Sequence, residues 1–183
     1  MKKIMMTLVA IAMATTMNAQ WYVGGSVGFG SVKAGSGDSE TTYKVIPEVG
    51  YSFNDKWSVG VALGYAKGSC SFGNSLQDYT QNVTTEVFSV NPYARYTFVN
   101  EGKFSIFCDG GIGFESWKDM GTNFSVGLRP GFAFKASDKI SLEAHIGFVG
   151  FNTFSPKGGG DSSNSFGLDL TGVANSFGIY YNF

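Results

Sequence analysis

A pattern of alternating apolar and polar residues recurs along the chain, and a short polar turn interrupts each copy. In residues 46–65 two alternating segments flank the turn Asn54-Asp55-Lys56. Residues 91–114 and 129–148 repeat this layout around turns near 99–103 and 136–139. Successive side chains of a strand point to opposite faces, so the alternation predicts strands and the short turns predict three hairpins.

The two ends of the chain supply the missing halves of this pattern. Residues 21–29 match the first half of a hairpin and residues 176–183 match the second, which ends aromatic-x-Phe in every copy. Longer connections rich in Gly and Ser, near 31–41, 67–82, 115–122 and 152–164, alternate with the short turns. We therefore predict an all-β fold, an eight-stranded antiparallel up-and-down barrel whose first strand pairs with its last.

One face of these strands carries most of the rings, and the other carries mainly Gly, Ser, Ala and Thr. The interior of an eight-stranded barrel is only wide enough to be filled by side chains, so the aromatic face does not fit inside. Leaving the rings in water would forfeit roughly 1.5–3 kcal/mol for each large side chain. We therefore predict a transmembrane barrel with its rings towards lipid. The predicted outward rings are Trp21, Phe29, Tyr43, Tyr51, Phe53, Trp57, Tyr65, Phe88, Tyr96, Phe98, Phe104, Phe114, Phe124, Phe132, Phe134, Phe148, Phe177, Tyr181 and Phe183.

A subset of these rings falls at strand ends beside the short turns, where an interfacial aromatic girdle belongs. The predicted girdle consists of Trp21, Phe53, Trp57, Phe98, Phe104, Phe134 and Phe183.

Two features depart from a regular barrel. Pro47, Pro92 and Pro130 lie inside strands that have neighbours on both sides, and their matching places predict a built-in bulge. In the last strand, Phe166, Leu168 and Leu170 have the opposite parity to the residues from Phe177 onwards. A bulge near Gly172, or a hairpin that ends there, would reconcile the two parts.

The first nineteen residues form a separate module. Lys2 and Lys3 precede an apolar run over residues 4–14, and Asn18-Ala19 precedes Gln20. This layout predicts a signal peptide over residues 1–19, with a cleavage site near Ala19, and a single domain over 20–183. The apolar run is too short for a membrane-spanning helix, which needs about 20 apolar residues.

Composition and charge exclude several classes of function. Charged residues make up 15% of the chain and aromatic residues 16%, and the acidic excess does not suggest nucleic-acid binding. Cys70 and Cys108 lie in different surroundings and have no CxxC or Cys/His spacing, so we expect neither a disulfide framework nor a metal site. The Gly-rich segments 24–30 and 158–160 match no phosphate-binding fingerprint, and we expect no cofactor.

The C-terminal residues Ser176, Gly178, Tyr181 and Phe183 resemble the sorting signal that the barrel-assembly machinery reads in bacterial outer-membrane barrels. Residues 20–183 as a whole resemble the small outer-membrane β-barrels of the OmpA/OmpX type, the porin-family outer membrane protein β-barrel domain group. The resemblance implies a bacterial outer-membrane location, contact with outer-membrane lipids and a monomer. The chain ends at Phe183, so the peptidoglycan-binding domain that some of these proteins add is not expected.

Charged residues at inward positions suggest how the lumen is filled. They are Lys44, Glu48, Arg95, Asp109, Arg129, Glu143 and His145. If Phe98 lies opposite Phe104, Arg95 faces Phe107 and lies diagonal to Asp109. If Phe134 lies opposite Ile140, Arg129 faces His145 and lies diagonal to Glu143. We expect these groups to pair as a plug near mid-barrel, with a gated polar path for protons or small ions as the alternative.

Two further classes of function need comparison. Some small outer-membrane barrels modify lipid A with His and Ser, but His145, the only histidine, has Glu143 and no Ser within two residues, so we expect no enzyme. The longer loops carry Phe72, Tyr79, Trp117 and Phe154, which would suit an adhesin or another host-binding barrel. Our principal expectation is a structural or surface-interaction role in the cell envelope without an open pore.

Overall fold

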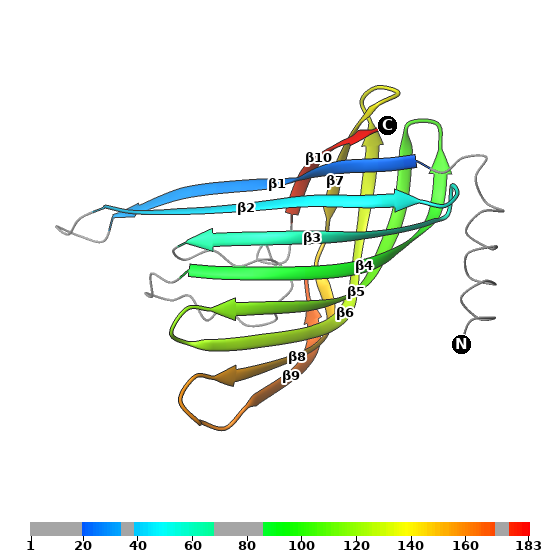
Figure 1. Cartoon of the computed structure of the whole chain (residues 1–183). Coiled ribbons are helices and arrows are strands. Elements are labelled where there is room, and N and C mark those ends of the chain that lie inside the picture. The colour runs from blue at the N-terminus through cyan, green and yellow to red at the C-terminus, as the bar shows by residue number, and fades with distance from the viewer. Residues whose placement is uncertain (1–19, 34–38, 68–85, 171–175) are drawn as a thin grey trace, which may run out of the picture.

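The structure is a computed structural model that describes residues 20–33, 39–67, 86–170 and 176–183. In these residues ten strand segments form one antiparallel sheet (Figure 1). They are β1 (Gln20–Lys33), β2 (Ser39–Ser52), β3 (Trp57–Lys67), β4 (Glu86–Glu101), β5 (Phe104–Trp117), β6 (Gly121–Lys135), β7 (Ile140–His145), β8 (Phe148–Pro156), β9 (Ser163–Asp169) and β10 (Ser176–Asn182). Within the described ranges no helix has the length and apolarity needed to cross a membrane. The predicted signal peptide lies outside them.

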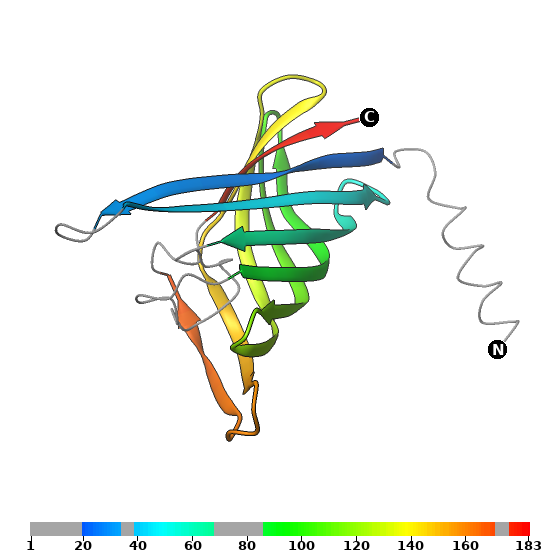
Figure 2. The same ribbon diagram turned by 60° about the vertical axis from the view of Figure 1, so that its left-hand side comes forward.

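The sheet closes on itself. β1 pairs with β10 from Tyr22↔Asn182 to Gly25↔Ile179, and β5 pairs with β6 along its whole length. Both β7 and β8 pair with β6, so together they make the seventh strand of the ring, and β9 and β10 make the eighth. Figure 2 shows β10 beside β1, with the C-terminus near the start of β1. The predicted eight-stranded antiparallel barrel is confirmed.

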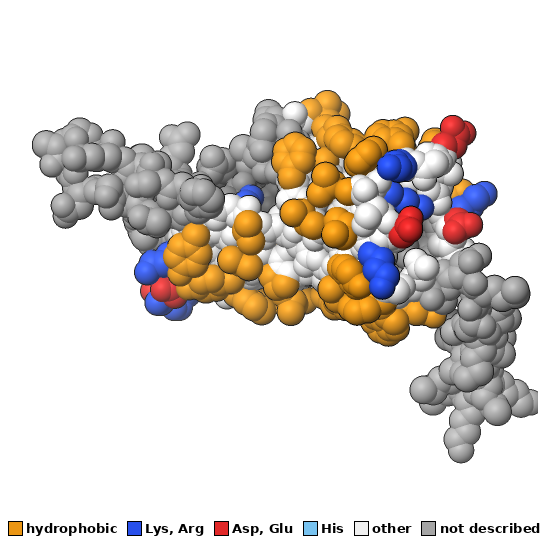
Figure 3. Space-filling model, turned by 90° about the horizontal axis from the view of Figure 1, so that it is seen from above, with side chains coloured by type: hydrophobic (Ala, Val, Ile, Leu, Met, Phe, Trp, Pro, Cys, Tyr) orange, Lys and Arg blue, Asp and Glu red, His pale blue; other side chains and the backbone are white. Residues whose placement is uncertain are grey.

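The wall presents its rings outward. Most of the predicted outward rings are exposed or half-buried, including Trp21, Trp57 and Phe98 at the short-turn end. Trp21 contacts Tyr51 with ring centroids 5.1 Å apart, and Trp57 contacts Tyr96 at 4.9 Å. Figure 3 shows hydrophobic side chains over much of the wall, with charged side chains gathered towards both ends. The contact of the girdle with lipid headgroups stays a prediction, and the side chain of Phe29 is not among those described.

The seventh strand contains a bulge that the sequence pattern did not reveal. Gly131 pairs with His145 in β7, whereas Leu128 pairs with Val149 in β8, so three residues of the seventh strand face two of β6. Gly147 has a φ of 77°, a left-handed conformation that favours glycine. The extra residue reverses the parity of the strand beyond it.

Phe148 is therefore inside the barrel, and our prediction that it faces outward was wrong. Ile146, before the bulge, is 46% exposed, whereas Phe148 is 3% exposed. The ring of Phe148 lies over Gly127 and Gly150, where a Cβ atom would come within 2.6 Å and 2.7 Å of its Cζ. Two glycines that face each other across β6 and β8 make the space for this ring.

The prolines do not mark bulges in their own strands. The register of β2 on β3 is the same before and after Pro47, from Val45↔Tyr65 to Glu48↔Ala62, and that of β4 on β5 is unchanged across Pro92. The register shift in β4 lies between Thr97 and Val99. Pro130 lies opposite the bulge of the seventh strand and its carbonyl accepts a hydrogen bond from Ile146 N–H at 2.9 Å. The bulge expectation is thus wrong for Pro47 and Pro92.

The eighth strand is interrupted where the parity of the sequence changes. Phe166 and Leu168 in β9 are exposed, and so are Phe177 and Ile179 in β10. The change of parity therefore falls between Leu170 and Ser176, in agreement with the sequence pattern. Gly172 lies outside the described residues.

At the long-loop end two of the predicted loops are mostly strand. β5 continues to Trp117 and β6 starts at Gly121, with Asp119 at a φ of 62° in the tight turn between them. A hydrogen bond from Lys157, at 3.0 Å, lowers the pKa of Asp119. Trp117 is 5% exposed and packs against Ala66 and Val87. The prediction that Trp117 is a surface binding residue was wrong, because the strand turns its side chain into the lumen.

Substitution of Leu128 by Arg tests the membrane-facing assignment of the wall. Leu128 is at the middle of β6 and is 50% exposed, so a charge there would lie at mid-membrane. We expect Leu128→Arg to lower the free energy of unfolding by about 2–4 kcal/mol in lipid vesicles, measured by urea titration. The control Phe98→Arg, near the end of β4, places its charge where it costs about 0–1 kcal/mol. Equal losses in the two variants would contradict the assignment.

Truncation of Phe148 tests the bulge. Phe148→Ala leaves a cavity in a packed interior, and we expect a loss of about 3–5 kcal/mol in the free energy of unfolding. Phe151→Ala removes an equal ring from the outer face of the same strand without opening a cavity inside the barrel. The loss should be clearly smaller in the same titration, and the reverse order would place Phe148 outside.

Candidate functional site

Arg95 connects three strands across the lumen. Its Nε and Nη2 donate to the two oxygens of Asp109 at 2.7 Å and 2.9 Å, and its Nη1 donates to Glu143 Oε2 at 2.7 Å. Arg95 is on β4, Asp109 on β5 and Glu143 on β7, and all three are buried. The guanidinium lies over the ring of Phe107, 3.7 Å from its centroid. The paired carboxylates and the ring together replace the water that this cation loses.

His145 extends this group of contacts. Its Nε2 lies 2.8 Å from Asp109 Oδ2 and its Nδ1 lies 3.3 Å from Ser176 Oγ. Because a carboxylate only accepts, Nε2 carries the proton and donates to Asp109. The hydroxyl of Ser176 then donates to Nδ1. The contact ties β10 to the charged residues of β5 and β7.

Three tyrosines surround the remaining carboxylate. The hydroxyls of Tyr93 and Tyr180 both donate to Glu48, the second at 3.1 Å, and Tyr93 is also hydrogen-bonded to Tyr22 at 2.8 Å. Sequence reasoning did not assign these tyrosines to the surroundings of Glu48. Their parity, opposite to that of the outward rings, was the available signal. We call Glu48, Arg95, Asp109, Glu143 and His145, with their three tyrosines, the plug.

The pairing inside the plug differs in register from the prediction. Arg95 lies directly opposite Asp109 rather than diagonal to it, because Glu101 and not Phe98 pairs with Phe104, so the turn between β4 and β5 is tighter than predicted. His145 lies opposite Gly131 and not opposite Arg129. The turn between β6 and β7 has the expected length but is centred one residue later, since Phe134 pairs with Leu142 and not with Ile140. Ser137 Oγ accepts from Ile140 N–H in this turn at 3.1 Å.

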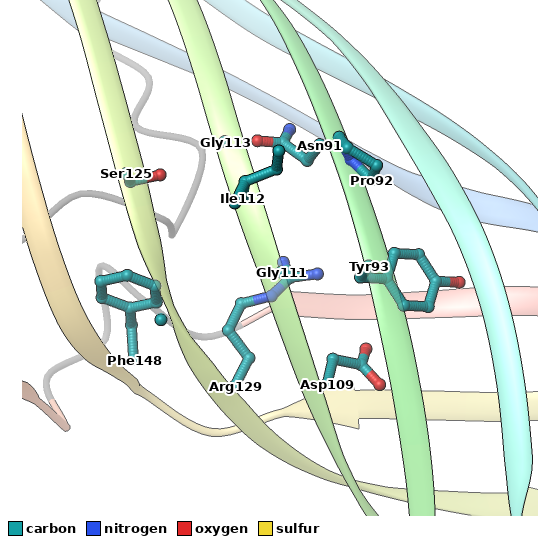
Figure 4. A pocket seen from close by; sticks show the side chains of 11 residues that line it. Asn91, Pro92, Tyr93, Asp109, Gly111, Ile112, Gly113, Ser125, Arg129 and Phe148 are labelled. Carbon is teal, nitrogen blue, oxygen red and sulfur yellow. The ribbon is translucent and has the colours of Figure 1, made fainter. Parts of the chain in front are cut away.

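Arg129 belongs to the predicted network but takes no part in the ion pairs of the plug. It lies opposite Asp109 in the ladder, but both Asp109 oxygens are taken by Arg95 and His145. Arg129 is half-buried and makes no ion pair with any described carboxylate. Figure 4 shows its guanidinium turned away from the Asp109 carboxylate towards Gly111.

The lumen is also closed above the plug. At the long-loop end Trp117, Ala66 and Val87 form an apolar cluster with Ile46, Met120 and Phe154 packed against it. Below it Glu115 is 1% exposed and accepts hydrogen bonds from Trp117 Nε1 and Asn123 Nδ2, both at 3.3 Å. Sequence reasoning missed Glu115 because it assigned this residue to a loop. At the short-turn end a polar cavity of about 350 Å³ extends down to the plug, whose residues Arg95 and Glu143 line it.

Ser176, His145 and Asp109 have the connectivity of a nucleophile, its base and an orienting carboxylate. The sequence did not reveal this arrangement, because Ser176 is 31 residues from His145. The cavity that Ser176 and His145 line measures about 20 Å³, which holds one water molecule and no acyl chain. Asp109 is also held by Arg95. The geometry favours a structural role for the three residues.

Metal-binding chemistry has no support in the described part of the chain. No three His, Cys, Asp or Glu side chains converge there in a manner that would hold a metal ion. Cys108 is a free thiol on the half-buried outer side of β5, and Cys70 lies outside the described residues.

The predicted assembly signal forms the strand that closes the ring. β10, which contains Ser176, Gly178 and Tyr181, pairs with both β1 and β7, and Phe183 N–H donates to the Trp21 carbonyl at 3.0 Å. Gly178 is required where the ring of Tyr180 crosses it, since a Cβ atom there would lie 2.8 Å from Tyr180 Cε2. Recognition of these residues by the assembly machinery stays a prediction.

Comparison with known families identifies the barrel. The family model of the outer membrane protein beta-barrel domain matches residues 4–179. The chain belongs to this family. No curated protein matches the sequence.

One solved structure of this kind of barrel shares the fold, and two others are similar over most of the chain. The crystal structure of Neisserial surface protein A is 12% identical, with a TM-score of 0.51 over 90% of this chain and 96% of that chain. The N-terminal β-barrel domain of OprF from Pseudomonas aeruginosa is 11% identical, with a TM-score of 0.47 over 91% and 100% of the two chains. The Yersinia pestis outer membrane protein Ail is 14% identical, with a TM-score of 0.47 over 91% and 100%. The protein is therefore a member of an outer-membrane β-barrel family with a closed eight-stranded fold.

Removal of Arg95 tests how far the plug stabilises this barrel. Arg95→Met leaves Asp109 and Glu143 buried without their cation, and we expect a loss of about 3–5 kcal/mol in the free energy of unfolding. The control is Lys118→Met, which breaks the exposed pair of Lys118 with Glu86 at 3.0 Å. Exposed pairs contribute about 0–1 kcal/mol, so the control should remain close to wild type in urea titration. A loss of similar size in both variants would contradict a stabilising plug.

Proposed function

We propose that this protein is a non-conducting outer-membrane barrel that acts as a closed scaffold in the cell envelope and holds its long-loop end at the cell surface. One observation carries this proposal: the cluster of Arg95, Asp109 and Glu143 bridges β4, β5 and β7 across the lumen. Membership of the family supports the membrane location, and the filled lumen supports the absence of a pore.

A narrow polar path is the competing interpretation, and the contacts of the plug disfavour it. An ion passing along the axis would have to separate Arg95 from the two carboxylates with which it is buried. It would then meet the apolar cluster of Trp117, Ala66 and Val87, which solvates no charge. Two unlike barriers in series favour a closed barrel.

The partners that we propose follow from the outer surface of the barrel, from its terminal strand and from its long-loop end. The exposed rings favour contact with outer-membrane lipids, and the terminal strand favours recognition by the barrel-assembly machinery, with the barrel acting as a monomer. A role in host or surface contact through the long-loop end is part of the proposal. Trp117 and Phe154 are unavailable for it, because they pack in and against the apolar cluster, and Phe72 and Tyr79 lie outside the described residues.

Conductance in planar bilayers tests the closed lumen. We expect the wild-type protein to give no steady single-channel openings, because the plug and the apolar cluster both block the axis. The double variant Arg95→Ala/Trp117→Ala removes the bridge and truncates the centre of the apolar cluster, and we expect it to give openings that the wild type lacks, whereas Arg95→Ala alone should stay closed. Lys118→Ala, at an exposed site, is the matched control and should be silent. Steady openings of equal size in wild type and the double variant would overturn the proposal.

A further inference from the structure

We propose that two buried water molecules, one on each side of Arg129, complete the plug and bind this arginine in place of an ion pair. The inference concerns the interior of the closed barrel and rests on the plug described above. It assigns a site to Arg129, a predicted network residue that takes no part in the ion pairs of the plug.

Two small cavities border Arg129, and Asn91 lines both of them. The Gly113 cavity is lined by Asn91, Gly113, Ser125, Arg129 and Phe148, and the Ser176 cavity by Glu48, Asn91, Arg129, His145, Ser176 and Tyr180. Each measures about 20 Å³. A single water molecule needs at least about 10–15 Å³ by this measure, so each cavity is the size of one water.

The side-chain oxygen of Asn91 faces the Gly113 cavity and lacks a hydrogen-bond donor. Asn91 is 6% exposed, and its Nδ2 donates to Ser89 Oγ at 3.1 Å. Its Oδ1 finds no donor among the described groups. This oxygen points over Gly113, 2.7 Å from where a Cβ atom would lie, with Ser125 Oγ on the other side of that position at 2.4 Å (Figure 4). The missing side chain of Gly113 thus opens a niche in front of an unpaired carbonyl.

Arg129 lines both cavities, and its guanidinium N–H groups need hydrogen-bond acceptors. A guanidinium carries five N–H donors and accepts nothing. Arg129 is half-buried, and the carboxylate opposite it in the ladder, Asp109, already accepts three hydrogen bonds from Arg95 and His145. The N–H groups of Arg129 therefore need other acceptors within the lumen. In the Ser176 cavity Arg129 and Glu48 line the same space without an ion pair between them.

The chemistry of the lining selects the ligand. A halide ion accepts from Arg129 but cannot donate to Asn91 Oδ1. A metal cation suits the carbonyl but is repelled by the guanidinium. Water both donates and accepts, is neutral, and matches the volume. One water joins Asn91 Oδ1 to Arg129, and the other separates Arg129 from Glu48 as a water-bridged ion pair.

The two arginines inside the barrel are therefore held in different ways. Arg95 is fixed by direct charge-assisted bonds, whereas Arg129 is held through water. Exchange of these two waters should be slow, since both sites lie between the plug and the apolar cluster.

A crystal structure of the detergent-folded protein, at a resolution that shows ordered water, tests the proposal. We expect one water in each cavity of the wild type. Gly113→Ala places a methyl group in the niche, and we expect it to remove the water of the Gly113 cavity and keep that of the Ser176 cavity. The control Gly110→Ala adds a methyl on the outer face of the same strand, where the nearest atom, Leu128 Cδ2, is 3.3 Å away, and both waters should remain.

Two results would overturn the inference. One is direct contact of Arg129 with a carboxylate oxygen in the wild type, with no water in either cavity. The other is an anomalous peak beside Arg129 in a bromide-soaked crystal, which would make the site an anion site. If Gly113→Ala does not fold, Asn91→Leu removes the same acceptor. In solution, nuclear Overhauser contacts between water and Arg129 Nε–H should be present in the wild type and weakened in either variant.

Discussion

The interior of an eight-stranded barrel is largely filled by side chains, so a charge placed there must find its partner in the protein or in a single confined water. Arg95 meets this constraint most completely, with two carboxylates and a ring around one guanidinium. The constraint also explains why the interior combines large polar groups with glycines. Tyr22 lies over Gly50 and Tyr93 over Gly60, each hydroxyl so close that a side chain at the glycine could not be accommodated. The glycines of the inner wall have no side chains and so leave room for the rings of the tyrosines and Phe148.

The outer surface follows from the same constraint. A lumen filled by the plug and its tyrosines cannot also take the other rings, so they lie outside, where acyl chains accommodate them. The strand ends are then the places where rings such as Trp57 and Tyr96 pack against each other. The membrane-facing surface and the closed interior therefore have one common cause, the small number of strands.

Much of this architecture could be predicted from the sequence, because it depends on period-two alternation and on the contrast between short and long connections. Strand number, ring closure and the inward position of Glu48, Arg95 and Asp109 all follow from that pattern. What depends on a single inserted residue could not be predicted. The bulge at Gly147 left the segment Ile146-Gly147-Phe148 looking like Ile112-Gly113-Phe114, although it turns Phe148 to the opposite face. The register of Arg129 could not be predicted for a similar reason, because the turn after Lys135 is centred one residue later than its composition suggests. Ser176 could not be assigned to His145, since no local pattern links residues on strands that are joined through an interrupted connection.

The hydrogen bond between Tyr180 and Glu48 joins residues 132 positions apart in the chain. A contact of such long range forms only after the intervening chain has lost most of its freedom, which makes it slow to nucleate. Glu48 lies on β2, while Tyr180 arrives with the final strand, so the carboxylate gains this donor only at the end of maturation. Until then Glu48 lacks this donor, and joining the two ends of the chain is the same event that completes its hydrogen bonding.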